Sequence, residues 1–344
     1  MADSGVGFDE PELSWTTQDI EQKLGFSGGR FTDTNAFFTF LVGLIFSTLF
    51  FVVLEFVIGD SGTNKEWKEK NNVPVMQEDG TPALNEDGTP RTKAKPIPIH
   101  KEFADKFINR GIGGYVMAAG IMLFFFWAVT ILVIKGRKVS FQRKILTLNL
   151  IPQDPNFFLN NATARDALLR IRGQVDDPKH YLLLNRIDVA LSNLQNIGEI
   201  SEVASLTNAQ ASIDEDQVLA SYSLINGFNW AIPVLGFIGT VLGLGAAIGE
   251  FGITIQNTGD IAALKDSLTD VTGGLSTAFD TTLLGLVASI VVQMVMTFRK
   301  RQEFLLLDEC NEYCQSYVLA KLKLEKSGGR RGGARCEVIL GDLF

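Results

Sequence analysis

Four long apolar runs constrain this chain more than any other feature of its sequence. They cover residues 36–58, 112–134, 230–249 and 275–297. A helix of about 20 residues rises about 30 Å, which is the thickness of the hydrocarbon core of a bilayer. Charged residues make up 20% of the chain, and they are concentrated between the runs. This segregation excludes an ordinary soluble enzyme and a disordered chain, and it predicts an all-α integral membrane protein with four transmembrane helices.

Basic residues that follow two of the runs predict how the chain is oriented in the membrane. Because Lys and Arg accumulate on the cytoplasmic side, the second and fourth runs should end in the cytoplasm. Residues 1–35 and the C-terminus then lie inside, whereas residues 59–111 and 250–274 form extracytoplasmic loops. The N-terminal segment is polar and acidic, so it does not resemble a signal peptide. The basic residues are Lys135, Arg137, Lys138, Arg143 and Lys144 after the second run, and Arg299, Lys300 and Arg301 after the fourth.

The segment 59–111 contains a short internal repeat. Residues 78–82 and 86–90 both read Glu-Asp-Gly-Thr-Pro. An Asp-Gly step favours a turn, so the two copies predict a small hairpin or meander outside the membrane. Calcium binding by these acids is the alternative, although a calcium loop needs more oxygen ligands at set spacings.

Helical periodicity continues on the cytoplasmic side. Asn161 begins a pattern that predicts a helix through Arg172. Residues 135–229 and 298–326 are therefore expected to be helical, and these helices should pack as a cytoplasmic bundle that extends spans two to four. Residues 327–344 are rich in Gly and Arg, and we expect a flexible tail there.

The sequence lacks the motifs of hydrolytic and nucleotide-driven enzymes. It contains no G-x-x-x-x-G-K-[ST] loop, no G-x-S-x-G elbow and no H-E-x-x-H helix. A net charge of −8 argues against a nucleic-acid partner, because phosphate binding needs a basic face. Cys310, Cys314 and Cys336 are expected to be unpaired thiols, since both histidines are distant in the sequence. We therefore expect no enzymatic activity, no metal site and no cofactor.

The last two runs contain polar and small residues. In the fourth run Thr282, Ser289 and Gln293 are seven and four residues apart, so at about 100° per residue they form one narrow stripe along the helix. Thr240 is the only polar side chain of the third run. Such hydroxyls either bond to neighbouring helices or line a wet pore, and the sequence supports both interpretations equally. Four glycines are expected to permit close helix packing: Gly236, Gly239, Gly243 and Gly285.

Three further residues interrupt the apolar runs. Asp280 lies between one and two turns inside the fourth span and about 160° around the helix from Thr282, so it is not on the stripe. It either hydrogen-bonds a neighbouring subunit or forms part of an ion entrance. Pro233 removes one backbone donor and permits a kink. Glu55 is close enough to the end of the first span to reach the membrane interface by snorkelling, and we expect no function for it.

Two motifs on consecutive spans resemble the signature of the MotA/TolQ/ExbB proton-channel family. Residues 230–244 read WAIPVLGFIGTVLGL, and residues 274–288 read GLSTAFDTTLLGLVA. The family patterns that they resemble are P-x-L-G-x-x-G-T-V-x-G and A-x-x-[TA]-T-x-x-G-L. The resemblance extends over about residues 183–325 and is sharpest in these two segments. The four-span layout is similar to that of MotA.

The resemblance implies a homopentamer in the bacterial inner membrane, arranged around two copies of a single-span partner of the MotB, TolR or ExbD type. The partner carries the titratable aspartate, and the flow of H⁺ or Na⁺ is coupled to mechanical work. By motif position Thr240 and Thr282 correspond to pore threonines, and Pro233 corresponds to a hinge proline. The acid that family members often carry five residues before the second threonine is Thr277 here. The residues expected along the ion path are Thr240, Asp280, Thr281, Thr282, Ser289 and Gln293.

The predicted function is therefore the channel subunit of an ion-driven motor, with membrane lipid as its surroundings. The alternative is a membrane scaffold or receptor without transport, assembled through its Gly and Thr helix faces. A secondary transporter would show inverted repeats and broken helices, and we find neither pattern in the sequence.

Overall fold

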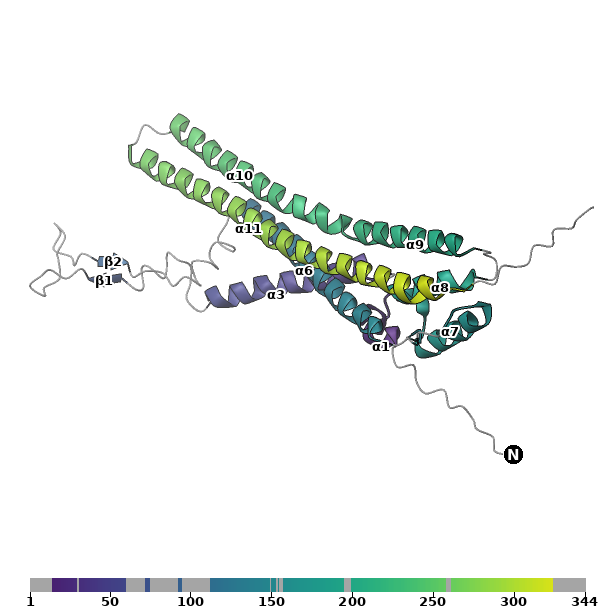
Figure 1. The fold of residues 1–344 in the computed structure, drawn as a ribbon. Coiled ribbons are helices and arrows are strands. Elements are labelled where there is room, and N and C mark those ends of the chain that lie inside the picture. The colour runs from purple at the N-terminus through teal and green to yellow at the C-terminus, as the bar shows by residue number, and fades with distance from the viewer. Residues whose placement is uncertain are drawn as a thin grey trace, which may run out of the picture. The chain divides into compact units, whose positions relative to one another are not determined.

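The computed structural model describes residues 14–29, 31–59, 72–74, 92–94, 112–148, 150–152, 154, 157–194, 199–257 and 261–323 (Figure 1). Four of its helices are long and apolar enough to cross a membrane. They are α3 (Ala36–Gly59), α6 (Ile112–Leu146), α10 (Ser223–Asn257) and α11 (Ile261–Tyr313). The expected architecture, a helical protein with four candidate spans, is confirmed.

The chain divides into two compact units. The membrane unit comprises the described residues of 24–138 and 218–303. It contains α3, α10 and the apolar parts of α6 and α11. The second unit comprises the described residues of 1–23, 139–217 and 304–344.

Helices α3 and α6 pack closely in the membrane unit. A Cβ atom on Gly43 would lie 2.7 Å from the Cα atom of Trp127, so the two backbones touch at this point. The indole Nε1 of Trp127 donates a hydrogen bond to Thr39 Oγ1 at 3.1 Å. The same indole packs on Phe40 of α3 and on Phe228 of α10, with ring centroids 4.9 and 4.4 Å away. Trp127 therefore joins three of the four candidate spans.

Helices α10 and α11 form an antiparallel hairpin that is longer than the apolar runs predicted (Figure 1). Residues 250–274 were expected to form a loop outside the membrane, but α10 continues to Asn257 and α11 begins at Ile261. A Cβ atom on Gly274 would lie 2.8 Å from the Cβ atom of Ala247, so the helices remain in contact beyond the fourth run. A helix satisfies its own backbone hydrogen bonds, and it can therefore extend past the apolar residues when it is paired in this way.

Two short strands lie within residues 59–111. Strand β1 (Asn72–Pro74) pairs with β2 (Thr92–Ala94) in antiparallel register. This pairing agrees with the expected hairpin. The Glu-Asp-Gly-Thr-Pro repeat itself lies outside the described residues.

The second unit contains short helices. These are α1 (Trp15–Gln18), α2 (Ile20–Lys23), α7 (Asn161–Gln174), the 3₁₀ turn Pro178–His180, α8 (Leu182–Ser192) and the greater part of α9 (Ile200–Ser221). The end of α11 continues through a π turn (Cys314–Val318) and a 3₁₀ turn (Leu319–Lys321). The predicted flexible tail lies outside the described residues.

Helix α7 begins where the periodicity predicted a helix. Asn160 is its N-cap, and the Asn160 side chain accepts hydrogen bonds from the main-chain nitrogens of Ala162 and Thr163. In return, Thr163 Oγ1 accepts a hydrogen bond from the main-chain nitrogen of Asn160 at 2.8 Å. This reciprocal cap satisfies donors that every helix leaves free at its start.

The core of the second unit contains a buried ionic cluster that the sequence did not predict. Arg186 Nε lies 2.5 Å from Asp214 Oδ2, and both side chains are buried. Arg186 also donates to Asn311 of α11. The Nε and Nη1 atoms of Arg186 thus find acceptors, whereas its buried Nη2 has no hydrogen-bond partner among the described residues. The cluster joins α8, α9 and α11 within the unit.

Candidate functional site

The candidate site lies between α10 and α11 in the membrane unit, where glycines bring the two helices together. A Cβ atom on Gly236, Gly239, Gly243 or Gly285 would lie 2.7–3.1 Å from an atom of the facing helix. The nearest atoms are the Thr281 carbonyl oxygen, Thr281 Oγ1, the Ala278 Cβ and the Ile232 carbonyl oxygen, respectively. These four positions are the glycines assigned to helix packing, and at each of them the facing helix occupies the space that a side chain would need.

Two threonines face each other across this contact. The hydroxyls of Thr240 and Thr282 hydrogen-bond to each other. Thr282 Oγ1 also lies 3.1 Å from the carbonyl oxygen of Gly236, and Thr240 Oγ1 lies 3.2 Å from the same oxygen and 3.3 Å from that of Ala278. Each hydroxyl has one proton, so the pair can donate two hydrogen bonds at any moment and retains acceptor lone pairs. Both side chains are half-buried.

A second polar contact lies further along the same helices. Ser289 Oγ is 3.1 Å from the main-chain oxygen of Asn229 and 2.9 Å from its side-chain oxygen. Asn229 Nδ2 donates to Gln293 Oε1 at 2.8 Å. The stripe of Thr282, Ser289 and Gln293 therefore faces α10 of the same chain.

Asn229 is a member of the site that the sequence analysis missed. It lies one residue before the third apolar run, so the search for polar residues inside that run did not include it. Its position four residues before Pro233 is the signal that could have found it. Proline has no N–H, and the carbonyl four residues earlier consequently lacks its usual helical donor. Helix α10 is nevertheless continuous through Pro233.

Thr281 and Asp280 are placed differently from the stripe. Thr281 is buried, with 1% of its surface exposed, and its hydroxyl donates to the carbonyl of Ala278 at 2.7 Å. Asp280 is half-buried. Because α11 begins at Ile261, Asp280 lies more than five helical turns from the start of the helix, and not near its end. Counted from the start of the apolar run, as the sequence alone allows, Asp280 lies much closer to the end of the helix.

A buried ion pair joins α6 to α11 within the membrane unit. Lys135 Nζ of α6 is 3.2 Å from Glu303 Oε1 of α11, and the two side chains are 0% and 1% exposed. Lys135 also donates to Ser221 Oγ at 2.8 Å and lies over the ring of Tyr222, 4.4 Å from its centroid. It further approaches the Thr32 carbonyl oxygen at 3.4 Å. In the sequence Lys135 is only a marker of orientation, whereas in the structure it is a junction of four segments.

The ionisable residues that are described do not form a metal site. No group of three or more His, Cys, Asp or Glu side chains within the described ranges could hold a metal ion. Cys310 and Cys314 are buried free thiols of the second unit. The chemistry that the candidate site can offer is therefore that of hydroxyl, amide and main-chain carbonyl groups.

The comparison with protein families locates this site in a known context. The sequence profile of the MotA/TolQ/ExbB proton channel family matches residues 176–310. That range contains α8, α9, α10 and most of α11, and thus every residue of the α10–α11 site. Comparisons with curated proteins and with solved structures gave no match. Residues 176–310 of the chain are therefore similar to the MotA/TolQ/ExbB proton channel family.

Proposed function

We propose that this chain is the channel subunit of a motor-like complex that couples the flow of H⁺ or Na⁺ to mechanical work. The observation that carries the proposal is the hydroxyl pair of Thr240 and Thr282, which lies between two apolar helices inside the family match. Hydroxyls with spare lone pairs can hydrogen-bond water or a hydrated ion, and few other groups do so within an apolar span.

The chain needs a partner for proton transfer. The stripe of Thr282, Ser289 and Gln293 contains hydroxyl and amide groups but no titratable group. We therefore propose that a single-span partner of the MotB, TolR or ExbD type supplies an aspartate, and that two copies of it lie within a pentamer of this chain. One charge that crosses a potential of 100 mV releases about 2.3 kcal/mol, so sizeable work requires many ions.

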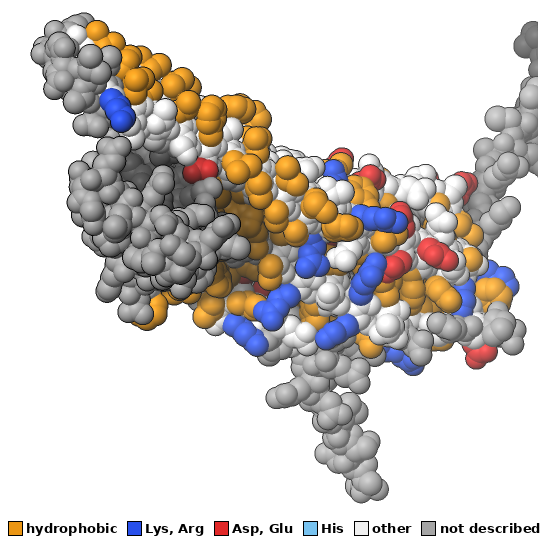
Figure 2. Space-filling model, turned by 90° about the vertical axis from the view of Figure 1, so that its left-hand side faces the viewer, with side chains coloured by type: hydrophobic (Ala, Val, Ile, Leu, Met, Phe, Trp, Pro, Cys, Tyr) orange, Lys and Arg blue, Asp and Glu red, His pale blue; other side chains and the backbone are white. Residues whose placement is uncertain are grey.

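Exposed apolar side chains support assembly in a membrane. Helices α10 and α11 present large hydrophobic residues at the surface, and Figure 2 shows the hydrophobic side chains on one face of the molecule. The most exposed examples are Trp230, Val241, Ile253, Phe298, Phe279 and Ile290. Neighbouring subunits or lipid would cover them. We place the complex in the bacterial inner membrane with both termini in the cytoplasm, on the basis of the family and of the basic residues after α6 and α11.

A scaffold without transport is the second candidate function. It is favoured by one specific observation, namely that the hydroxyls of Thr240, Thr282 and Ser289 all reach main-chain carbonyls of α10. Hydrogen bonds of this kind can serve helix packing alone.

Ion flux separates the two functions. The complex with its single-span partner would be reconstituted in vesicles, and ion uptake would be measured for the wild type, Thr282→Val and Thr297→Val. Thr297 is a matched control because it is an exposed threonine of α11 that bonds to the carbonyl of Gln293 within its own helix. We expect Thr282→Val to lower flux about tenfold, corresponding to a barrier about 1.4 kcal/mol higher, and Thr297→Val to leave it unchanged.

Assembly is measured in the same preparations. Native mass spectrometry of the co-expressed proteins should give five copies of this chain with two of the partner, for the wild type and for both variants. An assembled Thr282→Val complex with wild-type flux would exclude the pore role of this hydroxyl. Stable assembly without flux in any preparation would favour the scaffold.

A further inference from the structure

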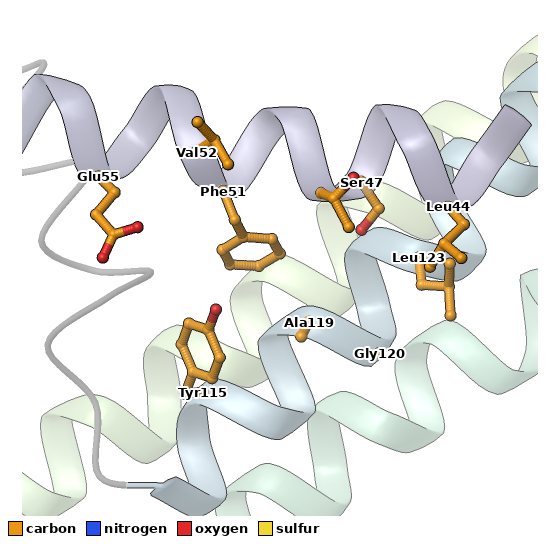
Figure 3. Close-up of a pocket in the computed structure, with 10 residues that line it drawn as sticks. Leu44, Ser47, Phe51, Val52, Glu55, Tyr115, Ala119, Gly120 and Leu123 are labelled. Carbon is orange, nitrogen blue, oxygen red and sulfur yellow. The ribbon is translucent and has the colours of Figure 1, made fainter.

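A groove runs between α3 and α6 in the membrane unit, apart from the α10–α11 site (Figure 3). Its volume is about 430 Å³, within the range of about 300–1,000 Å³ that is typical of ligand pockets. Apolar side chains line most of its length. Glu55 of α3 and Tyr115 of α6 lie at one end, and Leu44 and Leu123 lie at the other.

The groove follows from the way in which the two helices cross. The backbones of α3 and α6 touch at Gly43 and Trp127, so no space remains there. Further along, the rings of Phe51 and Tyr115 bridge the helices with centroids 5.4 Å apart. Between these contacts α6 presents Ala119, whose small side chain leaves room beside the helix.

The length of the groove matches one leaflet of a bilayer. Leu44 and Glu55 are eleven residues apart, which corresponds to about 16 Å along a helix. Half of a hydrocarbon core of about 30 Å is about 15 Å. Glu55 is also close to the end of α3 at Gly59, so its carboxylate lies near the depth of the lipid headgroups.

One end of the groove carries the carboxylate of Glu55. Glu55 is exposed, and no described cation forms an ion pair with it. A carboxylate accepts strong hydrogen bonds from an ammonium group and repels a phosphate that carries no compensating charge. A headgroup with a primary amine therefore complements this end of the groove, whereas an anionic headgroup does not.

We propose that this groove binds one acyl chain of a phospholipid with a primary-amine headgroup, with the amine at the carboxylate of Glu55, a residue for which the sequence predicted no function. The acyl chain lies along the apolar walls towards Leu44 and Leu123. The site is formed by α3 and α6, which lie outside the residues of the family match, so it does not depend on the proposed channel function. A channel without this lipid and a lipid site without a channel are both possible outcomes.

The headgroup preference is tested with three lipids that share the same acyl chains. The full chain, purified in mild detergent, would be mixed with equal amounts of phosphatidylethanolamine, phosphatidylglycerol and phosphatidylcholine, and bound lipid would be counted by native mass spectrometry. We expect phosphatidylethanolamine to exceed each of the others by about two- to fivefold, as an exposed ion pair allows.

Two conservative variants test whether Glu55 causes the headgroup preference. Glu55→Gln keeps the shape of the side chain and removes its charge, so we expect the preference to disappear. Glu250→Gln is the matched control, because Glu250 is an exposed acid of α10 that does not line the groove. A preference that survives Glu55→Gln, or that is lost equally in Glu250→Gln, would overturn the proposal.

The acyl site is tested by filling it. Ala119→Phe places a ring in the groove and should remove one tightly held lipid per chain. Val133→Phe adds the same ring at an exposed position of α6 outside the groove and should not. The proposal is wrong if Ala119→Phe retains the lipid, or if wild-type assemblies hold no lipid because another protein segment covers the groove. If Ala119→Phe does not fold, the Glu55→Gln comparison still decides the question.

Discussion

The hydroxyl oxygen of Ser289 lies 3.1 Å from the main-chain oxygen of Asn229, which is the carbonyl that Pro233 leaves without a helical donor. A proline inside a helix removes the hydrogen bond to the residue four positions earlier. Here the Ser289 hydroxyl of α11 can donate its single proton to that carbonyl of α10 or, at 2.9 Å, to the side-chain oxygen of Asn229. The irregularity of one helix is thus compensated by the other, and this contact lies within the candidate ion-path stripe.

Ser289 and Pro233 should therefore be energetically coupled. Ser289→Ala leaves the Asn229 carbonyl unpaired and should lower the free energy of unfolding by about 1–2 kcal/mol. In a Pro233→Ala background the restored N–H can bond to that carbonyl, so the same serine substitution should cost much less. Unfolding of the four proteins in detergent micelles, titrated with denaturant, gives the coupling energy. Costs that simply add would show that the proline and the serine act independently.

Gly239 is expected to tolerate no side chain. Gly239→Ala would bring a methyl group within 2.7 Å of Thr281 Oγ1 and 3.0 Å of Thr281 Cβ, so the helices must separate or Thr281 must rotate. We expect a loss of about 1–3 kcal/mol in the free energy of unfolding. Gly245→Ala is the control, because a Cβ atom there meets nothing within 4 Å, and alanine at a helical site stabilises by about 0.5–1 kcal/mol relative to glycine. Equal stabilities of the two variants would contradict the close packing.

Substitution of only one partner in the ion pair of Lys135 and Glu303 should lower the stability of the chain. Glu303→Gln or Lys135→Met leaves one buried partner uncompensated and should destabilise the chain by about 3–5 kcal/mol. The double variant Lys135→Met with Glu303→Met removes both charges and should recover most of that loss. Thermal unfolding of the three variants measures these differences. A double variant that is no more stable than the single variants would contradict this cost of an unpaired buried charge.

Asp176 predicts a pH dependence in the second unit. Burial acts to raise the pKa of this carboxyl group, but hydrogen bonds from the main-chain nitrogens of Thr16, Trp15 and Asp177 outweigh it and hold the pKa below its ordinary value. The folded unit then favours the ionised form. The Asp176 carboxylate makes its full contribution to stability above the pKa that this group has in the unfolded chain, which is about 3.9. The contribution is lost as the pH falls through the lower pKa that the group has in the folded unit.

The consequence is measurable on the N-terminal helices. Asp176→Asn should increase hydrogen exchange in residues 14–23 at pH 7, because the side chain accepts from Thr16 N at 3.0 Å and from Ser14 Oγ at 3.3 Å. Near pH 3 the difference from the wild type should shrink. Asp166→Asn, at an exposed position of α7, is the control. A difference that is equally large at both pH values would contradict the role of the charge.

Local patterns were sufficient to predict much of this protein. The four apolar runs predicted the candidate spans, because the length and hydropathy of a helix are properties of contiguous residues. The spacing of Thr282, Ser289 and Gln293 predicted that they share a face, because helical periodicity is also local. The motifs in residues 230–244 and 274–288 predicted the family that the profile comparison found. The continuation of α10 and α11 through residues 250–274 was missed, since polar helical segments lack the apolar signal that marked the runs.

What the tertiary structure decided is which side chains meet. Trp15 is 1% exposed and packs on Phe141 and Tyr181, although it lies in a polar segment that gave no sign of a core. Lys135 and Glu303 are separated by 168 residues, and Ser289 and Asn229 by 60. The sequence by itself determined the spans, the polar stripe and the family signature. Only the fold determined the partners of the stripe and the groove beside Glu55, because hydropathy and periodicity describe one segment at a time, whereas a contact depends on how two distant segments pack.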